Sequence, residues 1–193
     1  MPVSAVVTSQ TLCRLDGPNG VGKSTLFRAL LGISSNFSGS AQWSVSDTTF
    51  SGLLALREQG VIYMPQKGYS LRSLSVGELQ GLLTSHPLRN PVRSRLFTFL
   101  DKFKDCRGRK IGELSGGEQQ MYALLATLAQ PGRFYLLDEP FRSIDPGHRV
   151  GLWDIFRDIF TKGRAGLILT DHDGALDGIL DFDAHIRLEC KEA

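Results

Sequence analysis

The sequence has no long hydrophobic run, few cysteines and little excess charge. No apolar stretch approaches the roughly 18 residues that are needed to span a bilayer, and the amino end lacks the basic flank of a secretory signal. The three cysteines are far apart and form no metal-binding or redox spacing. We therefore expect a cytosolic protein of a reducing compartment, in which each cysteine is a small buried side chain.

The near balance of charge also limits the classes of partner. A net charge of +2 is too small to indicate nucleic acid or an acidic partner. The chain of 193 residues has no internal repeat or low-complexity linker, and this length suits one domain with a sizeable core. We expect a single domain over residues 1–193 and no nucleic-acid partner.

Apolar strands alternate with helical segments along the chain, which is typical of a layered α/β fold. The pattern predicts strands at 3–8, 11–15, 41–45, 61–64, 134–137 and 166–169. It predicts helices at 23–31 and 115–129, and another whose apolar face includes Leu152 and Phe160. The segment 75–105 is predicted to be a helical insertion, and Ser75 with Glu78 predicts a capping box at its start.

A glycine-rich loop lies between a predicted strand and a predicted helix: residues 17–24 read Gly-Pro-Asn-Gly-Val-Gly-Lys-Ser. Backbone N–H groups of such a loop can surround a β-phosphate, and the positive end of the helix faces the same anion. Lys23 can reach the β- and γ-phosphates, and the Ser24 hydroxyl can ligate Mg²⁺. The candidate nucleotide-binding residues are Gly17, Asn19, Gly20, Gly22, Lys23, Ser24 and Thr25.

A second glycine-rich loop, Leu-Ser-Gly-Gly-Glu at 114–118, precedes a long predicted helix. By itself it could be only a helix cap. Beside a phosphate loop, we interpret the Ser115 hydroxyl and the N–H groups of Gly116 and Gly117 as a second phosphate-binding element. One chain has one of each loop, which favours two chains arranged around shared nucleotides.

Two adjacent carboxylates follow the apolar strand at 134–137. Asp138 lies where the carboxyl end of a parallel strand would meet the phosphate loop, a place that suits Mg²⁺ ligation. Glu139 can take a proton from an attacking water.

Together these motifs resemble those of the ATP-binding-cassette ATPases over nearly the whole chain. Residues 17–25 resemble the Walker A loop, 114–118 the signature and 134–139 the Walker B strand. Smaller motifs follow in the same order: Gln66 resembles the Q-loop glutamine, 143–145 the D-loop and His172 the switch histidine. The resemblance implies an α/β P-loop NTPase core with a helical signature-motif subdomain at about 70–122 and a short antiparallel β region.

The resemblance also implies roles for individual residues. Two ATP molecules with Mg²⁺ would lie between head-to-tail protomers, each signature loop facing the nucleotide of the other chain. The implied catalytic residues are Lys23, Gln66, Glu139 and His172, and the implied metal ligands are Ser24, Gln66 and Asp138. Asp145 would communicate across the interface.

Two features depart from the family pattern or lie outside it. No Phe, Tyr or Trp precedes Gly17, whereas family members usually carry an adenine-stacking aromatic there. We therefore expect nucleotide to bind more weakly or with less base selectivity, unless Phe37, Trp43 or another chain replaces this aromatic or the sequence is a piece of a longer one. The segment 86–110 contains eight basic residues, which form either a solvated helix face or a contact with acidic lipid or a partner.

The leading hypothesis is an ATP-binding and hydrolysing subunit of a membrane transporter, similar to small haem-exporter-type subunits. It would lie on the inner face of the cell membrane with a membrane-spanning partner and a second ATPase protomer. The alternative is a soluble cassette ATPase of nucleic-acid maintenance or translation, although the interval from Lys23 to Ser115 is too short for a long coiled coil. A third class, nucleotide binding without turnover, is disfavoured by Glu139 and His172.

Overall fold

The computed structural model describes residues 7–8, 10–33, 43–45, 48–50, 53–67, 71–85, 90–162, 165–171, 174, 176–178 and 180–189. Most of the strand predicted at 3–8 lies outside these residues, as do Phe37, His172 and Cys190.

A five-stranded sheet forms the centre of the molecule, in the order β4-β5-β6-β1-β7. Its strands are β1 (Leu12–Asp16), β4 (Val61–Met64), β5 (Phe134–Asp138), β6 (Gly166–Thr170) and β7 (Ala184–Arg187). Each pair of neighbours is parallel. The carboxyl ends of all five strands therefore lie at one edge of the sheet, where loops from distant parts of the sequence meet.

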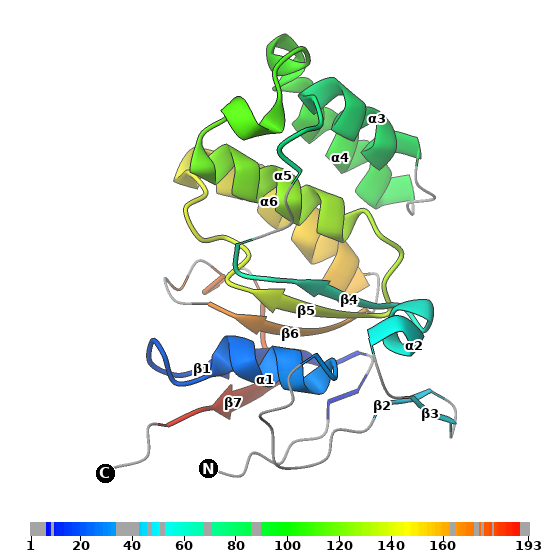
Figure 1. The fold of residues 1–193 in the computed structure, drawn as a ribbon, viewed down its shortest axis with the longest axis vertical. Coiled ribbons are helices and arrows are strands. Elements are labelled where there is room, and N and C mark those ends of the chain that lie inside the picture. The colour runs from blue at the N-terminus through cyan, green and yellow to red at the C-terminus, as the bar shows by residue number, and fades with distance from the viewer. Residues whose placement is uncertain are drawn as a thin grey trace.

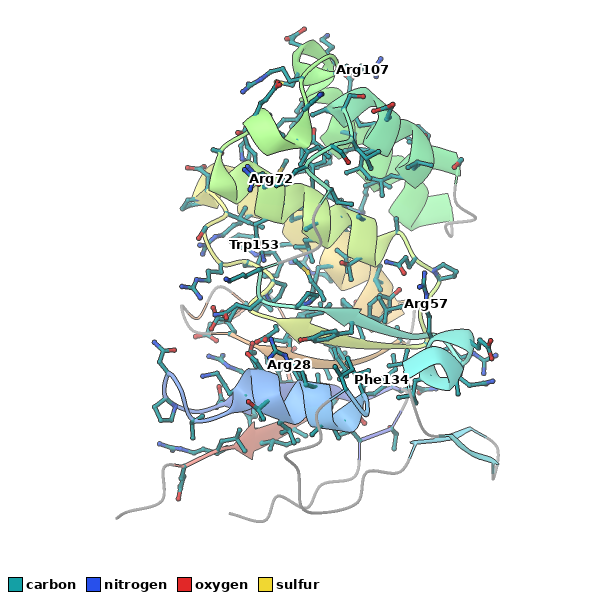
Figure 2. The ribbon with its side chains drawn as sticks, viewed as in Figure 1. Arg28, Arg57, Arg72, Arg107, Phe134 and Trp153 are labelled. Atoms are coloured by element: carbon teal, nitrogen blue, oxygen red, sulfur yellow. The ribbon has the colours of Figure 1, made fainter. Side chains whose placement is uncertain are left out.

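Both faces of this sheet are buried, because alternate side chains of the strands belong to two different cores. On β5, Phe134 and Leu136 pack in the core that contains Phe27 of α1, whereas Tyr135 and Leu137 pack in the larger core on the other face. The helices that flank the sheet are α1 (Lys23–Leu30), α2 (Leu53–Glu58), α5 (Gly116–Leu128) and α6 (Pro146–Arg157). In Figure 1, α5 and α6 lie on one side of the sheet and α1 on the other. Figure 2 shows Phe134 between the sheet and α1.

A helical part lies beyond α5 and α6, at the end of the molecule opposite β7 (Figure 1). It contains α3 (Val76–Ser85), α4 (Asn90–Asp101) and the short 3₁₀ helices η1 (Lys104–Cys106) and η2 (Ile111–Glu113). Helix α3 contacts α4 and α5, and α4 contacts α6. The predicted helix start is confirmed, since Ser75 Oγ accepts a 3.1 Å hydrogen bond from the N–H of Glu78 and Ser75 N donates a 2.7 Å hydrogen bond to Glu78 Oε2. The subdomain bounds of about 70–122 stay a prediction.

The expected antiparallel β region is wrong for the main sheet, whose described strands all pair in parallel. Among the described residues, antiparallel pairing occurs in the ribbon of β2 (Trp43–Val45) and β3 (Thr48–Phe50) and at an isolated bridge between Ser75 and Lys110. The sequence pattern did not predict β3, α2 or β7. Helix α2 has six residues and follows a segment rich in turn-forming residues, and β7 alternates between half-buried and exposed side chains at the edge of the sheet.

The basic segment at 86–110 is partly structural. Arg95 pairs with Asp154 at 3.3 Å and with the buried Asp158, which ties α4 to the end of α6. Arg107, at the far end of the helical part in Figure 2, donates from Nε to Oε1 of Gln80 at 3.2 Å. Two of the basic side chains of this segment therefore form ion pairs or hydrogen bonds within the fold.

Other expectations concern membrane spans and cysteines. None of the helices in the described part is both long and apolar enough to cross a bilayer.

Cys13 is buried, as expected, and burial raises the pKa of its thiol to about 11. Cys106 is only half-buried, because it lies in the short turn η1 beside the core rather than within it.

Candidate functional site

The predicted phosphate loop connects β1 to α1 at the carboxyl edge of the sheet. At its start, the N–H of Leu188 donates a 2.8 Å hydrogen bond to the carbonyl of Asp16. A Cβ at Gly17 would lie 2.7 Å from the carbonyl oxygen of Leu188, so only glycine fits there. At its end, Gly22 is the N-cap of α1 with a φ of 109° and provides no side-chain cap. The loop thus turns directly into a helix whose positive end carries no capping side chain.

Lys23 is buried, and its ammonium group lies against the loop. Its Nζ donates hydrogen bonds to the carbonyls of Gly17 at 2.6 Å and Pro18 at 3.1 Å. Ser24 is half-buried, whereas Thr25 and the loop residue Asn19 are exposed. A cation and a bare helix start therefore converge on the loop, an arrangement that can hold a phosphate chain.

The second glycine-rich loop begins α5 with a capping box. Ser115 Oγ donates to Glu118 Oε2 at 2.7 Å and accepts from the Glu118 N–H at 3.3 Å, while Ser115 N donates to the same Oε2 at 2.8 Å. These bonds from Ser115 lower the pKa of Glu118. Ser115 and Gly116 are exposed. A Cβ at Gly117 would lie 2.2 Å from the carbonyl oxygen of Ser143, so this glycine permits close contact between two loops.

The two adjacent carboxylates lie where β5 ends, and both are buried. Thr170, at the end of the neighbouring β6, joins them: its Oγ1 donates to Asp138 Oδ1 at 2.9 Å and accepts from the Glu139 N–H at 2.8 Å. The other oxygen of Asp138, Oδ2, is buried without a hydrogen-bond partner in the described part of the chain. A buried carboxylate oxygen without a donor is the kind of ligand that Mg²⁺ prefers.

Gln66 follows β4 and contacts Glu139, which follows the neighbouring strand β5. Its Nε2 donates a 2.9 Å hydrogen bond to Oε2 of Glu139, although 73 positions separate the two residues. Arg142 Nη1 lies 3.0 Å from the same oxygen. Gln66 and Arg142 border a groove of about 270 Å³, whose other lining residues are Lys67, Gly116, Gln120 and Ser143. The structure therefore brings Gln66, the carboxylate of Glu139 and the start of α5 together.

Not every predicted residue can be placed. His172 and Phe37 lie outside the described residues, and Trp43 is placed only as part of the β2 backbone. Asp145 is the exposed N-cap of α6 and accepts a 2.8 Å hydrogen bond from the Gly147 N–H.

Three residues of the site had not been singled out from the sequence: Thr170, Arg142 and Gln120, whose Nε2 donates to the carbonyl of Glu139 at 3.4 Å. Thr170 carried a usable signal, because a polar residue that ends an apolar parallel strand often faces a site at that edge. For Arg142 and Gln120 the sequence offered no such signal, since their roles come from contacts across loops.

The comparisons with known proteins agree with this geometry. A family model described as "ABC transporter" matches residues 1–142. A probable ABC transporter ATP-binding protein of Azorhizobium caulinodans is 34% identical over 161 residues, which cover 81% of this chain and 57% of that protein. The chain therefore spans only about half the length of such curated relatives: 57% of this one and 50% of an iron(III) import ATP-binding protein of Rhodococcus jostii.

Solved structures show the same fold. A dimeric bacterial ABC transporter cassette is similar with a TM-score of 0.72 and 17% identity, over 98% of this chain and 87% of that one. The archaeal ribosome recycling factor, solved with a ribosomal stalk protein, is similar with a TM-score of 0.70 and 28% identity, over 91% of this chain and 31% of that one. Since the family model matches most of its length, the chain belongs to the ABC transporter family of ATP-binding proteins.

Proposed function

We propose that this chain binds and hydrolyses ATP and powers a membrane transporter through ATP-driven dimerisation. The observation that carries the proposal is the cluster at the end of β5. There the buried carboxylate of Glu139 receives a hydrogen bond from Gln66, next to Asp138 with its unpartnered Oδ2. Such a cluster serves phosphoryl transfer, which depends on positioning and on neutralising charge.

The phosphate loop would hold the nucleotide. Backbone N–H groups of Gly20 and Gly22 would surround the β-phosphate, and Lys23 would exchange its bonds to the loop carbonyls for bonds to the phosphates. Ser24, Gln66 and Asp138 would hold Mg²⁺, which when bound neutralises charge on the phosphate oxygens. The unpartnered Oδ2 of Asp138 fits that ion.

Hydrolysis then depends on the chain's own acid–base groups. Glu139 would accept a proton from the attacking water through its carboxylate, and Gln66 would fix the direction of that carboxylate. By family resemblance, His172 would hold the water and the γ-phosphate.

The second loop would complete the site of another protomer. Ser115 and Gly116 are exposed, and they lie at the start of a helix of 13 residues, so its positive end can face a γ-phosphate from outside the chain. The similar solved cassette is dimeric. We infer that two copies, or this chain and a related one, enclose the nucleotides.

Transport is favoured over ribosome-linked work by the more similar relative. A probable ABC transporter ATP-binding protein is 34% identical to this chain, whereas the ribosome recycling factor is 28% identical. We infer a membrane-spanning partner, with this chain on the inner face of the cell membrane.

Purification of the tagged protein from detergent extracts tests this proposal. We expect a polytopic membrane protein to co-purify in fixed proportion and the complex to hydrolyse ATP. Recovery of an active ATPase without any membrane protein would contradict the transporter assignment. Salt-sensitive nucleic-acid binding that stimulates ATP hydrolysis would favour the soluble alternative.

A further inference from the structure

Arg142 contacts the carboxylate to which we assign the role of base. Its Nη1 lies 3.0 Å from Oε2 of Glu139, and Gln66 Nε2 donates to the same oxygen at 2.9 Å. The arginine side chain is 57% exposed whereas that of the glutamate is 9% exposed. The pair therefore joins a solvent-facing cation to a buried anion, a geometry that gives a strong, charge-assisted hydrogen bond.

A tight turn places the arginine over the carboxylate. The N–H of Arg142 donates a 3.1 Å hydrogen bond to the carbonyl of Glu139. Glu139 and Ser143, before and after this turn, have positive φ values of 50° and 61°. Left-handed backbone at residues other than glycine costs free energy, so such a turn persists only where its surroundings hold it.

The surroundings that hold the turn include the start of α5, which the proposed function places against a second protomer. The carbonyl oxygen of Ser143 lies against Gly117 at the start of α5, and Arg149 Nε donates to the carbonyl of Ile144 at 2.9 Å. A second protomer that binds at Ser115 and Gly116 would therefore press on the loop that contains Arg142. The exposed guanidinium can then move into water at little cost.

A general base needs a lone pair directed at the attacking water. In this structure two donors occupy Oε2 of Glu139. We propose that Arg142 is a positioning residue that holds the Glu139 carboxylate in a resting orientation until the loop 143–145 moves on dimerisation. This inference rests on the proposed ATPase function.

Steady-state kinetics of the purified protein test it, at protein concentrations at which only a small fraction is dimeric and dimerisation limits the rate. Because dimerisation has to break the bond between Arg142 and Glu139, we expect Arg142→Ala to raise the apparent kcat per chain about fivefold, the equivalent of one net hydrogen bond, with KM for ATP unchanged. Arg142→Lys keeps the charge and should give a smaller rise. The matched control is Arg157→Ala, which removes another exposed arginine paired with a carboxylate three positions away, Asp154, outside the site; it should leave kcat unchanged.

A second readout is independent of turnover: the ¹³C resonance of the Glu139 carboxylate, assigned through Glu139→Gln. We expect Arg142→Ala to shift it and Arg157→Ala to leave it in place. An unchanged or lower kcat in Arg142→Ala overturns the proposal. If the wild-type protein does not hydrolyse ATP, the proposed function fails. The resonance then tests the restraint of Glu139 by Arg142 on its own: a shift in Arg142→Ala supports the restraint, and no shift overturns it.

Discussion

Thr170 donates a 2.9 Å hydrogen bond from its hydroxyl to Oδ1 of Asp138, across two neighbouring parallel strands. The same hydroxyl accepts the N–H of Glu139 at 2.8 Å. One side chain that had not been singled out from the sequence therefore aligns both carboxylate residues, and all three are buried. Substitution of Thr170 therefore tests how much these two hydrogen bonds contribute to stability and to the site.

We expect Thr170→Val to lower the free energy of unfolding by about 2–3 kcal/mol, because it leaves two buried polar groups without this partner. ATP hydrolysis should fall as well. Urea unfolding followed by circular dichroism measures the first effect. The control is Thr127→Val, at an equally buried threonine whose hydroxyl donates only to the carbonyl of Ala123 within α5. Equal losses in the two variants would contradict the prediction.

Gly117 and Gly116 differ sharply in what surrounds them. We expect Gly117→Ala to destabilise the fold by about 1–3 kcal/mol, because its Cβ would lie 2.2 Å from a backbone oxygen of Ser143. Gly116→Ala has open space and begins a helix, so it should be neutral or slightly stabilising. Thermal unfolding of both variants distinguishes them, and the prediction fails if Gly117→Ala is as stable as Gly116→Ala.

Replacement of the proposed base should separate nucleotide binding from turnover. We expect Glu139→Gln to lower kcat about a hundredfold or more and to accumulate an ATP-bound dimer in size-exclusion chromatography. Glu58→Gln, at an exposed glutamate of α2, serves as the control and should behave as wild type. Hydrolysis at the wild-type rate in Glu139→Gln would refute the catalytic assignment.

The capping box of α5 predicts a dependence of stability on pH. Hydrogen bonds from Ser115 lower the pKa of Glu118 from its ordinary value of 4.5. The folded state therefore holds this proton less tightly than the unfolded state. The stability that Glu118 contributes is present above that ordinary value and is lost as the pH falls through the lower pKa of the folded protein.

We expect Glu118→Gln, which cannot titrate, to lose stability less steeply than wild type as the pH falls from about 6 to about 3. Urea unfolding over this range measures the difference. Ser115→Ala removes the donor hydroxyl but keeps the backbone N–H that donates to the same carboxylate. It should therefore flatten the dependence in part, while costing about 1 kcal/mol at neutral pH. Parallel curves for wild type and both variants would contradict the assigned cause.

Local sequence was sufficient for several elements. The glycines and Lys23 predicted a loop followed by a helix, and α1 begins at Lys23. Ser75 with Glu78 predicted a capping box, which is present. The apolar runs at 61–64, 134–137 and 166–169 became β4, β5 and β6 within one residue. These features depend on neighbours within four positions, so the sequence pattern carries them.

Elements without a strong local pattern were missed. The short α2 and the strand β3 have six and three residues, and the edge strand β7 alternates over only four positions, which is too short a run to stand out. The helix with the apolar face from Leu152 to Phe160 ends as an α-helix at Arg157 and continues as the π-helical turn Asp158–Lys162. Asp158 is buried there and pairs with Arg95 of α4, a tertiary contact that no local pattern shows.

The sequence by itself determined that this chain has two glycine-rich helix starts and a pair of carboxylates after a buried strand, because each is a short-range arrangement. Only the tertiary structure decided how they meet. Parallel strands bring Thr170 to Asp138, a loop 73 positions away brings Gln66 to Glu139, and Gly117 admits Ser143 at a distance that any side chain would block. Packing across the sheet edge, rather than local sequence, sets these contacts, and through them the direction of the carboxylate of Glu139.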